Sequence, residues 1–232
     1  ACMLATCVPG VTELGYFTQR NEVVQAATKK LSGKCGKKAK WEYNTKTKTL
    51  TISGTGAMYD YSNKAILEEE EVEYAKFPGW DSISSGIEKV VIGNGITKIG
   101  SYAFEEDHIG TVKIGKKVKT IGYGAFKNST VTKVECGDAL VEIGASAFFD
   151  CTLLTEITLG NKVKTIGGQA FEYCSSLKAV KSGENVVTIN RYAFNGCSSL
   201  EKAELGKKVK TIETGAFSEC GIQEVDFGEN ME

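Results

Sequence analysis

The segment VKTIGGQAFEYC, residues 163 to 174, recurs with small changes along the second half of the chain. Its most regular part is an Ala-Phe pair that occurs six times at intervals of 22 or 23 residues: Ala103-Phe104, Ala125-Phe126, Ala147-Phe148, Ala170-Phe171, Ala193-Phe194 and Ala216-Phe217. A fixed period in this range is typical of a solenoid, in which a short unit buries its apolar side only by stacking on copies of itself. The repeat therefore predicts a stack of coils whose regular surface suits binding better than catalysis.

Each unit also contains a glycine that usually follows an apolar residue, at Gly93, Gly115, Gly137, Gly160, Gly183, Gly206 and Gly228. In most units a Val-x-x-Ile segment, such as Val163 to Ile166, lies between this glycine and the next Ala-Phe pair. Each unit is thus predicted to contain a strand, a glycine turn, a short extended segment and a helical turn that carries Ala-Phe. Seven glycines indicate six units and a partial seventh.

The composition is that of an ordinary globular chain. Hydrophobic residues make up 41% and charged residues 25%, and the formal net charge is -1, which gives no reason to expect nucleic acid as a partner. No stretch reaches the roughly 18 uninterrupted apolar residues of a transmembrane helix. The chain starts at Ala1 without the charged and apolar regions of a signal peptide, so we expect any such peptide to have been removed or never present.

The part of the chain before the repeats divides into two regions. Residues 1–33 fit no repeat and are predicted to form an N-terminal arm. Residues 34–88 are predicted to form an N-terminal cap, because residues 41–43 and 50–53 alternate as strands of a β-hairpin, and Phe77 and Trp80 are suited to cover the open end of the stack. The solenoid itself is assigned to residues 89–232.

The cap and repeat motifs together resemble a known family. The run Cys35-Gly36, Trp41, residues 49–61 (TLTISGTGAMYDY) and Trp80, followed by units of the form Ile-Gly-x-x-Ala-Phe-x-x-Cys-x-x-Leu, is similar to the BspA-type leucine-rich repeat family over residues 34–232. This resemblance implies a leucine-rich-repeat-like, β-rich solenoid, a right-handed stack of units of about 22 to 23 residues with an N-terminal β cap. It also implies a secreted or cell-surface protein of a bacterium or protozoan that adheres to host or neighbouring-cell macromolecules. Asp107 and Ser129 depart from the repeat by replacing its cysteine, and the chain stops inside a seventh unit.

Four of the eight cysteines follow the repeat phenylalanine by three residues, at Cys151, Cys174, Cys197 and Cys220. Stacking places them in one column, where parallel Cβ vectors disfavour disulfides and a linear arrangement disfavours tetrahedral zinc, so they are predicted to be buried thiols of the core beside the phenylalanines. Cys136 takes an apolar strand position and is also predicted to be core. Outside the repeats, a disulfide within the trio Cys2, Cys7 and Cys35 stays open, with one cysteine left over.

Catalytic and metal-binding patterns find little support. His108 is the only histidine and accompanies no nucleophile, and the acidic run of residues 68–71 lacks the glycine-punctuated spacing of a calcium loop, so both are interpreted as solvated surface. We therefore expect no enzyme activity, no cofactor and no metal. The triplet Asn128-Ser129-Thr130 is a possible glycosylation site.

Strand alternation predicts one candidate binding surface, on the exposed face of the longer strands. It consists of Lys113, Lys133, Glu135, Glu156, Thr158, Lys181, Lys202 and Glu204. This face is mixed in charge and poor in the aromatic residues that dominate binding hot spots, so an ordinary solvated sheet is the alternative.

A ridge of lysines is a second candidate surface. It gathers Lys116, Lys117, Lys119, Lys162, Lys164, Lys207, Lys208 and Lys210, and is interrupted at Asp138 and Glu184. Such a ridge suits sulfated glycans, nucleic acid or anionic lipid, while solubility is the alternative explanation. The sequence thus predicts an extracellular or cell-surface module that binds a protein or glycan. The alternatives are a structural spacer or attachment module of a larger surface protein and, less favoured, a secreted enzyme with a polar pocket in the cap.

Overall fold

The computed structural model describes residues 31–64, 76–222 and 224–226. The chain divides into two units, Ala1–Leu31 and Ser32–Glu232, and the predicted N-terminal arm lies outside the described part apart from its last three residues. The second unit begins with strands β1 (Ser32–Lys34), β2 (Lys38–Asn44) and β3 (Thr49–Ala57), and a 3-10 helix, η3, follows at Asp81–Gly86. Strands β2 and β3 pair antiparallel and form the predicted hairpin.

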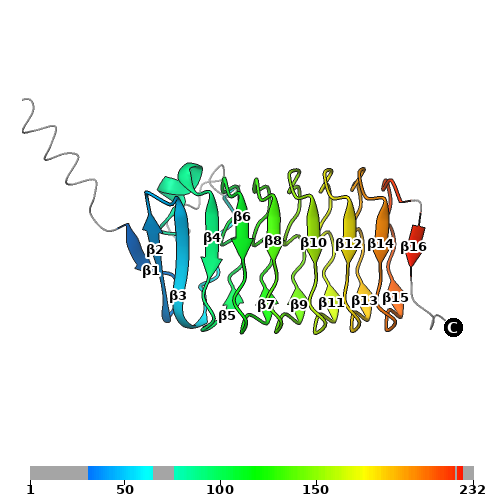
Figure 1. Cartoon of the computed structure of the whole chain (residues 1–232), viewed down its shortest axis with the longest axis horizontal. Coiled ribbons are helices and arrows are strands. Elements are labelled where there is room, and N and C mark those ends of the chain that lie inside the picture. Colours follow the sequence, from blue (N-terminus) through cyan, green and yellow to red (C-terminus); the bar gives the residue numbers. More distant parts are fainter. Residues whose placement is uncertain (1–30, 65–75, 223, 227–232) are drawn as a thin grey trace, which may run out of the picture. The chain divides into compact units, whose positions relative to one another are not determined.

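The repeats form two parallel sheets on different sides of the stack (Figure 1). The long-strand sheet contains β4 (Lys89–Ile92), β6 (Thr111–Lys113), β8 (Lys133–Glu135), β10 (Glu156–Thr158), β12 (Ala179–Lys181), β14 (Lys202–Glu204) and β16 (Glu224–Asp226). The short-strand sheet contains β5 (Ile96–Ile99), β7 (Thr120–Ile121), β9 (Glu142–Ile143), β11 (Thr165–Ile166), β13 (Thr188–Ile189) and β15 (Thr211–Ile212). Strand β3 starts both sheets, since its first half pairs with β4 and its end pairs with β5. The predicted β solenoid with a hairpin cap is therefore confirmed.

The third side of each coil is the segment that contains Ala-Phe, here called the turn face. The sequence predicts a helical turn there, and the structure has a different turn. The amide of Phe126 donates to the carbonyl of Ala147 in the next coil at 2.8 Å, whereas the neighbouring amide of Lys127 closes a turn onto Gly124 at 3.1 Å. A helix would direct all its amides along its own chain. Here every second amide joins the next coil, because each turn face contains two left-handed residues, at positions 102 and 106, 124 and 128, 146 and 150, 169 and 173, 192 and 196, and 215 and 219.

The Ala-Phe phenylalanines form a continuous ladder in the core. Neighbouring rings lie 5.0 to 5.2 Å apart, centroid to centroid, and their planes differ by 2° to 9°. The five rings from Phe104 to Phe194 are fully buried. Phe217 was also predicted to be core, but it is only partly buried, because among the described residues it has a ring partner on one side alone.

The cysteine column forms a second ladder beside the rings. The thiols of Cys151, Cys174, Cys197 and Cys220 each donate to the carbonyl of a phenylalanine in the preceding coil, at 2.9 to 3.1 Å. All four are free, and burial raises the pKa of Cys151 to about 12. The geometry is that of unbridged thiols, and their reactivity stays a prediction for this column. Burial is confirmed for the first three, whereas Cys220 is only partly buried, again because no described coil covers it.

The cap joins the stack through Trp80, which continues the phenylalanine ladder. Its indole ring is fully buried and stacks on Phe104 at 5.3 Å, as predicted for an aromatic that covers the open end. The indole Nε1 donates to Asp107 Oδ2 at 3.1 Å, and the Lys64 ammonium lies 3.1 Å from Asp107 Oδ1 and 2.6 Å from Asp81. Asp107 occupies the cysteine column, so its departure from the repeat is explained: a carboxylate can accept the indole N–H and pair with lysine, and a thiol cannot do both.

Candidate binding surfaces

The exposed face of the long-strand sheet is a row of paired charges. Its strands have outward first and third residues and an inward second residue, so seven of the eight sheet-face residues are exposed and Glu204 is partly exposed, while their role in binding stays a prediction. Glu204 contacts Lys202 at 3.1 Å and Lys181 at 3.6 Å, and the hydrogen bond from Lys202 holds the pKa of the Glu204 carboxyl below its usual value. Exposed pairs of this kind contribute little to stability or affinity. This face therefore offers a hydrated, nearly neutral surface.

All eight lysines of the predicted ridge are exposed, but they occupy alternate coils. The coils between them carry Asp138 and Glu184 at the turn position that Lys116 and Lys207 occupy. Because neighbouring coils lie about 4.7 to 4.9 Å apart, the lysine groups are separated by about 10 Å, which is about a Debye length at physiological salt. The lysines thus form separate groups rather than a continuous ridge, and their role in binding stays a prediction.

The turn face carries the exposed aromatic side chains, which the sequence analysis did not assign to any surface. Tyr123 and Tyr173 are 48% and 45% exposed. Tyr102 and Tyr123 meet edge to face at 5.3 Å between ring centroids, and Phe149 and Tyr173 do so at 5.7 Å. Tyrosine gives a rigid, amphipathic contact surface with few rotatable bonds, and it is enriched at binding hot spots. These aromatic residues stand at different offsets from the repeat phenylalanine, from three residues before it at Tyr123 to two residues after it at Tyr173, so they form no column in the repeat, and nothing in the sequence showed that they face outward.

Three of the turn-face tyrosines lie over glycines one coil further along. A Cβ atom on Gly124, Gly196 or Gly215 would approach the ring of Tyr102, Tyr173 or Tyr192, respectively, closer than 3.0 Å. These glycines also have positive φ angles, so both the backbone and the ring require glycine. Each ring is therefore seated on the backbone of the next coil. Arg191 adds a guanidinium 4.8 Å from the centroid of the Tyr192 ring.

No catalytic arrangement is present among the described residues. His108 is exposed, and no group of three or more His, Cys, Asp or Glu side chains in this part of the chain is suited to a metal ion. Burial raises the pKa of Asp107 to about 6, but its carboxylate is fully buried against Trp80 and Lys64, where no substrate reaches it. The acidic run of residues 68–71 lies outside the described residues.

The remaining predicted sites have mixed outcomes. Asn128 is exposed at a left-handed turn position, while Ser129 of the same triplet is buried and lies 3.6 Å from the Cys151 sulfur; glycosylation of Asn128 stays a prediction.

Cys35 is fully buried and burial raises its pKa to about 12, but residues 2 and 7 lie outside the described part, so a disulfide within that trio stays a prediction. Cys136, predicted to be core, is only partly buried. In the described part of the chain no helix is long and apolar enough to cross a membrane.

Comparison with known proteins gives one family match and several structural matches. The BspA type leucine rich repeat region matches over residues 45–132, 82–197 and 119–232. A leucine rich cell surface protein from Faecalibacterium prausnitzii has a similar structure, with a TM-score of 0.57 and 26% identity over 82% of this chain and 52% of that one. No curated protein sequence is significantly similar.

Two further solved structures show the same fold at 20% identity. The pneumococcal vaccine antigen PcpA matches over 83% of this chain and 50% of its own length, with a TM-score of 0.57. The leucine rich repeat protein of T. pallidum matches over 80% of this chain and 87% of its own, with a TM-score of 0.55. The chain thus spans about half the length of the first two structures.

Proposed function

Because the chain belongs to the BspA-type leucine-rich repeat family, we propose that it is a non-catalytic recognition module of a cell-surface or secreted protein. A similar structure belongs to a bacterial protein described as a cell surface protein, which supports this location. The observation that carries the proposal is the aromatic set of the turn face, in which Tyr123 and Tyr173 are exposed and Tyr102, Phe149 and Tyr192 are partly exposed. Its partner is another extracellular protein.

The turn face suits a protein partner because its rings are already held in place. Tyr173 lies over Gly196 and Tyr192 over Gly215, so these side chains have little rotamer freedom left to lose when a partner binds. Recognition is non-covalent and multipoint, with aromatic contacts repeated along the stack. The long-strand sheet is a weaker choice, because its described outward residues include no aromatic side chain and Glu204 is already paired.

Binding of the purified full chain to immobilised extracellular matrix proteins tests the proposal. Surface plasmon resonance at roughly 0.05 M and 0.5 M salt separates two mechanisms, since contacts between exposed charges are screened at high salt and aromatic contacts are not. We expect a bound protein whose affinity changes little with salt. An affinity that collapses at high salt would favour the lysine groups instead.

Matched variants locate the contact surface. Tyr123→Ser and Tyr173→Ser together should weaken binding at least about tenfold, in line with the loss of interface hot spots. Leu153→Ser is the control, because Leu153 is as exposed as Tyr123 at 48% but lies outside the turn face. Equal losses in both variants would contradict the turn face as the contact surface. Absence of binding to every protein tested would favour the structural spacer.

A further inference from the structure

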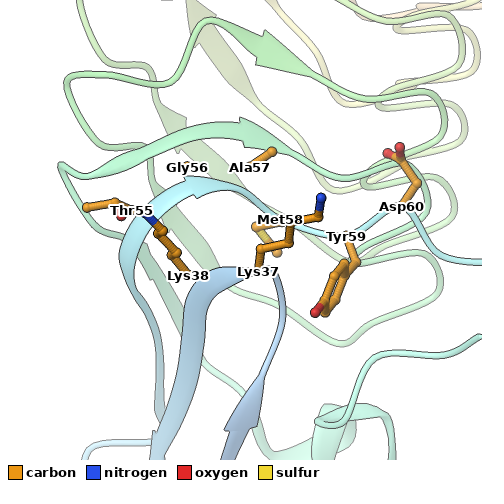
Figure 2. A pocket seen from close by; sticks show the side chains of 8 residues that line it. All are labelled: Lys37, Lys38, Thr55, Gly56, Ala57, Met58, Tyr59 and Asp60. Carbon is orange, nitrogen blue, oxygen red and sulfur yellow. The ribbon is translucent and has the colours of Figure 1, made fainter.

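A hollow in the cap, distant in sequence from the repeat surfaces, has the features of a ligand site. It has a volume of about 580 Å³ and is lined by the turn before β2 and the end of β3: Lys37, Lys38, Thr55, Gly56, Ala57, Met58, Tyr59 and Asp60 (Figure 2). Pockets of roughly 300 to 1,000 Å³ suit small organic ligands rather than a bare inorganic ion. The size therefore points to a ligand of at least one sugar ring.

The lysines that line this hollow have no partner of opposite charge within residues 31–64, 76–222 and 224–226. Lys37 and Lys38 are both exposed, and neither forms an ion pair with any described residue. The one carboxylate that lines the hollow, Asp60, is already engaged: it pairs with Lys98 at 2.8 Å and accepts the amide of Ser101 at 2.7 Å. In Figure 2 the lysine side chains reach toward the end of β3, and the Asp60 carboxylate lies away from them. The hollow therefore presents two ammonium groups that no carboxylate of the described part of the chain pairs with.

More lysines surround the hollow. The stretch from residue 34 to residue 40 reads KCGKKAK and contains no acidic residue, although the whole chain has a net charge of -1. Lys34 lies directly opposite Lys40 in the β1–β2 pairing, and like charges facing each other across strands are unfavourable. The Lys76 ammonium lies 3.2 Å from the centroid of the Tyr59 ring. This local excess of positive charge raises the concentration of anions near the hollow.

The backbone around the lysines is held tightly. The amide of Cys35 donates to the carbonyl of Ala39 at 3.1 Å, which closes the turn that carries Lys37 and Lys38. A Cβ atom on Gly36 would overlap the carbonyl of Ala57, and one on Gly54 would overlap the carbonyl of Lys38, so both glycines let the two sides of the hollow approach. Lys37 and Lys38 thus project from a turn that a backbone hydrogen bond closes and that packs against the end of β3.

We propose that this hollow binds an anionic sugar, with Lys37 and Lys38 holding its sulfate or carboxylate group and the Tyr59 ring packing against the sugar. The exposed Ala57 side chain and the partly exposed ring of Tyr59 suit the C–H surface of a sugar, which distinguishes this ligand from a free phosphate or sulfate. The site is independent of the turn face, so protein binding and sugar binding can succeed or fail separately.

Isothermal titration of the full chain with four probes tests the proposal. The probes are a heparin-derived tetrasaccharide for sulfate, a hyaluronan tetrasaccharide for carboxylate, a neutral cello-oligosaccharide and inorganic sulfate. We expect at least one anionic tetrasaccharide to bind more tightly than the neutral sugar and than inorganic sulfate, with an affinity that falls at higher salt. Binding of neither anionic probe, or equal binding of inorganic sulfate, overturns the proposal.

Charge-matched variants place the site. Lys37→Gln with Lys38→Gln should weaken binding of the anionic tetrasaccharide at least about tenfold without changing the melting temperature, because both side chains are exposed. Lys46→Gln with Lys178→Gln removes the same charge at exposed positions outside both candidate lysine surfaces and should change binding less than about twofold. Tyr59→Leu should weaken binding of the sugar while leaving any weak binding of sulfate unchanged. An equal loss in the two lysine variants would place the ligand elsewhere.

Discussion

The phenylalanine ladder predicts a large difference between truncating a ring inside the stack and truncating the last described ring. Phe171 is fully buried and stacks on Phe148 at 5.2 Å and on Phe194 at 5.1 Å. Replacing a buried phenylalanine by alanine costs about 3 to 5 kcal/mol, and each lost ring contact contributes about 0.5 to 1.5 kcal/mol of that loss. Since Phe171 loses two ring contacts, we expect Phe171→Ala to lower the free energy of unfolding by about 4 kcal/mol.

Phe217→Ala is the matched control. Its ring has one described partner, Phe194 at 5.2 Å, and is only partly buried. Complete burial of a phenylalanine is favourable by about 1.5 to 3 kcal/mol, and partial burial without an enclosed cavity should cost less, so we expect about 1 to 2 kcal/mol. Phe171→Ala keeps the backbone carbonyl that accepts the Cys197 thiol, so this variant removes only the ring.

Urea unfolding measured by far-UV circular dichroism compares these variants. Both tryptophans, Trp41 and Trp80, belong to the cap, so fluorescence reports that end while circular dichroism reports the whole stack. Solenoids can unfold in parts, so a single free energy of unfolding is valid only where the fluorescence and circular dichroism transitions coincide. A loss below about 1 kcal/mol for Phe171→Ala, or equal losses for the two variants, would refute the argument that the ladder is the continuous core.

Three further predictions concern the cap joint, the turn face and the cysteine column. Because burial raises the pKa of Asp107 to about 6, the folded protein holds the proton on this carboxyl more tightly than the unfolded chain does. The contribution of Asp107 to stability should therefore fall by roughly 1 to 3 kcal/mol as pH rises from about 4 to about 6. In chemical unfolding experiments, Asp107→Asn should flatten this part of the pH profile. Gly196→Ala should cost more than about 1 kcal/mol, and a double-mutant cycle with Tyr173→Ala should show coupling if the ring meets the added methyl group. Thiol titration of unfolded, unreduced protein should find at least the four cysteines of the column reactive, whereas a smaller number would contradict free thiols.

The repeat made much of the architecture predictable because residues at the same distance in sequence from Ala-Phe take the same place in every coil. Counting from Ala-Phe located the buried second residue of each long strand, the cysteine column and the exposed lysines, and the structure has them at those positions. The same counting missed the turn face. Of the six residues that lie two positions after a repeat phenylalanine only Tyr173 is aromatic, and its outward direction depends on left-handed residues that a helical turn would not contain. It also overstated burial at Phe217, which a repeat pattern treats like every other copy.

The sequence by itself determined the period, the core columns and the family resemblance, because in a stack each residue meets its own counterpart one repeat away and a short-range pattern is enough. Only the tertiary structure decided the features built from residues without such counterparts. Lys64, Trp80 and Asp107 meet at the cap joint, and Lys37 and Tyr59 meet at the hollow, across separations that no period relates. Tyr102, Tyr173 and Tyr192 lie over glycines of the next coil, and each of these tyrosines is itself one of the two left-handed residues of its coil.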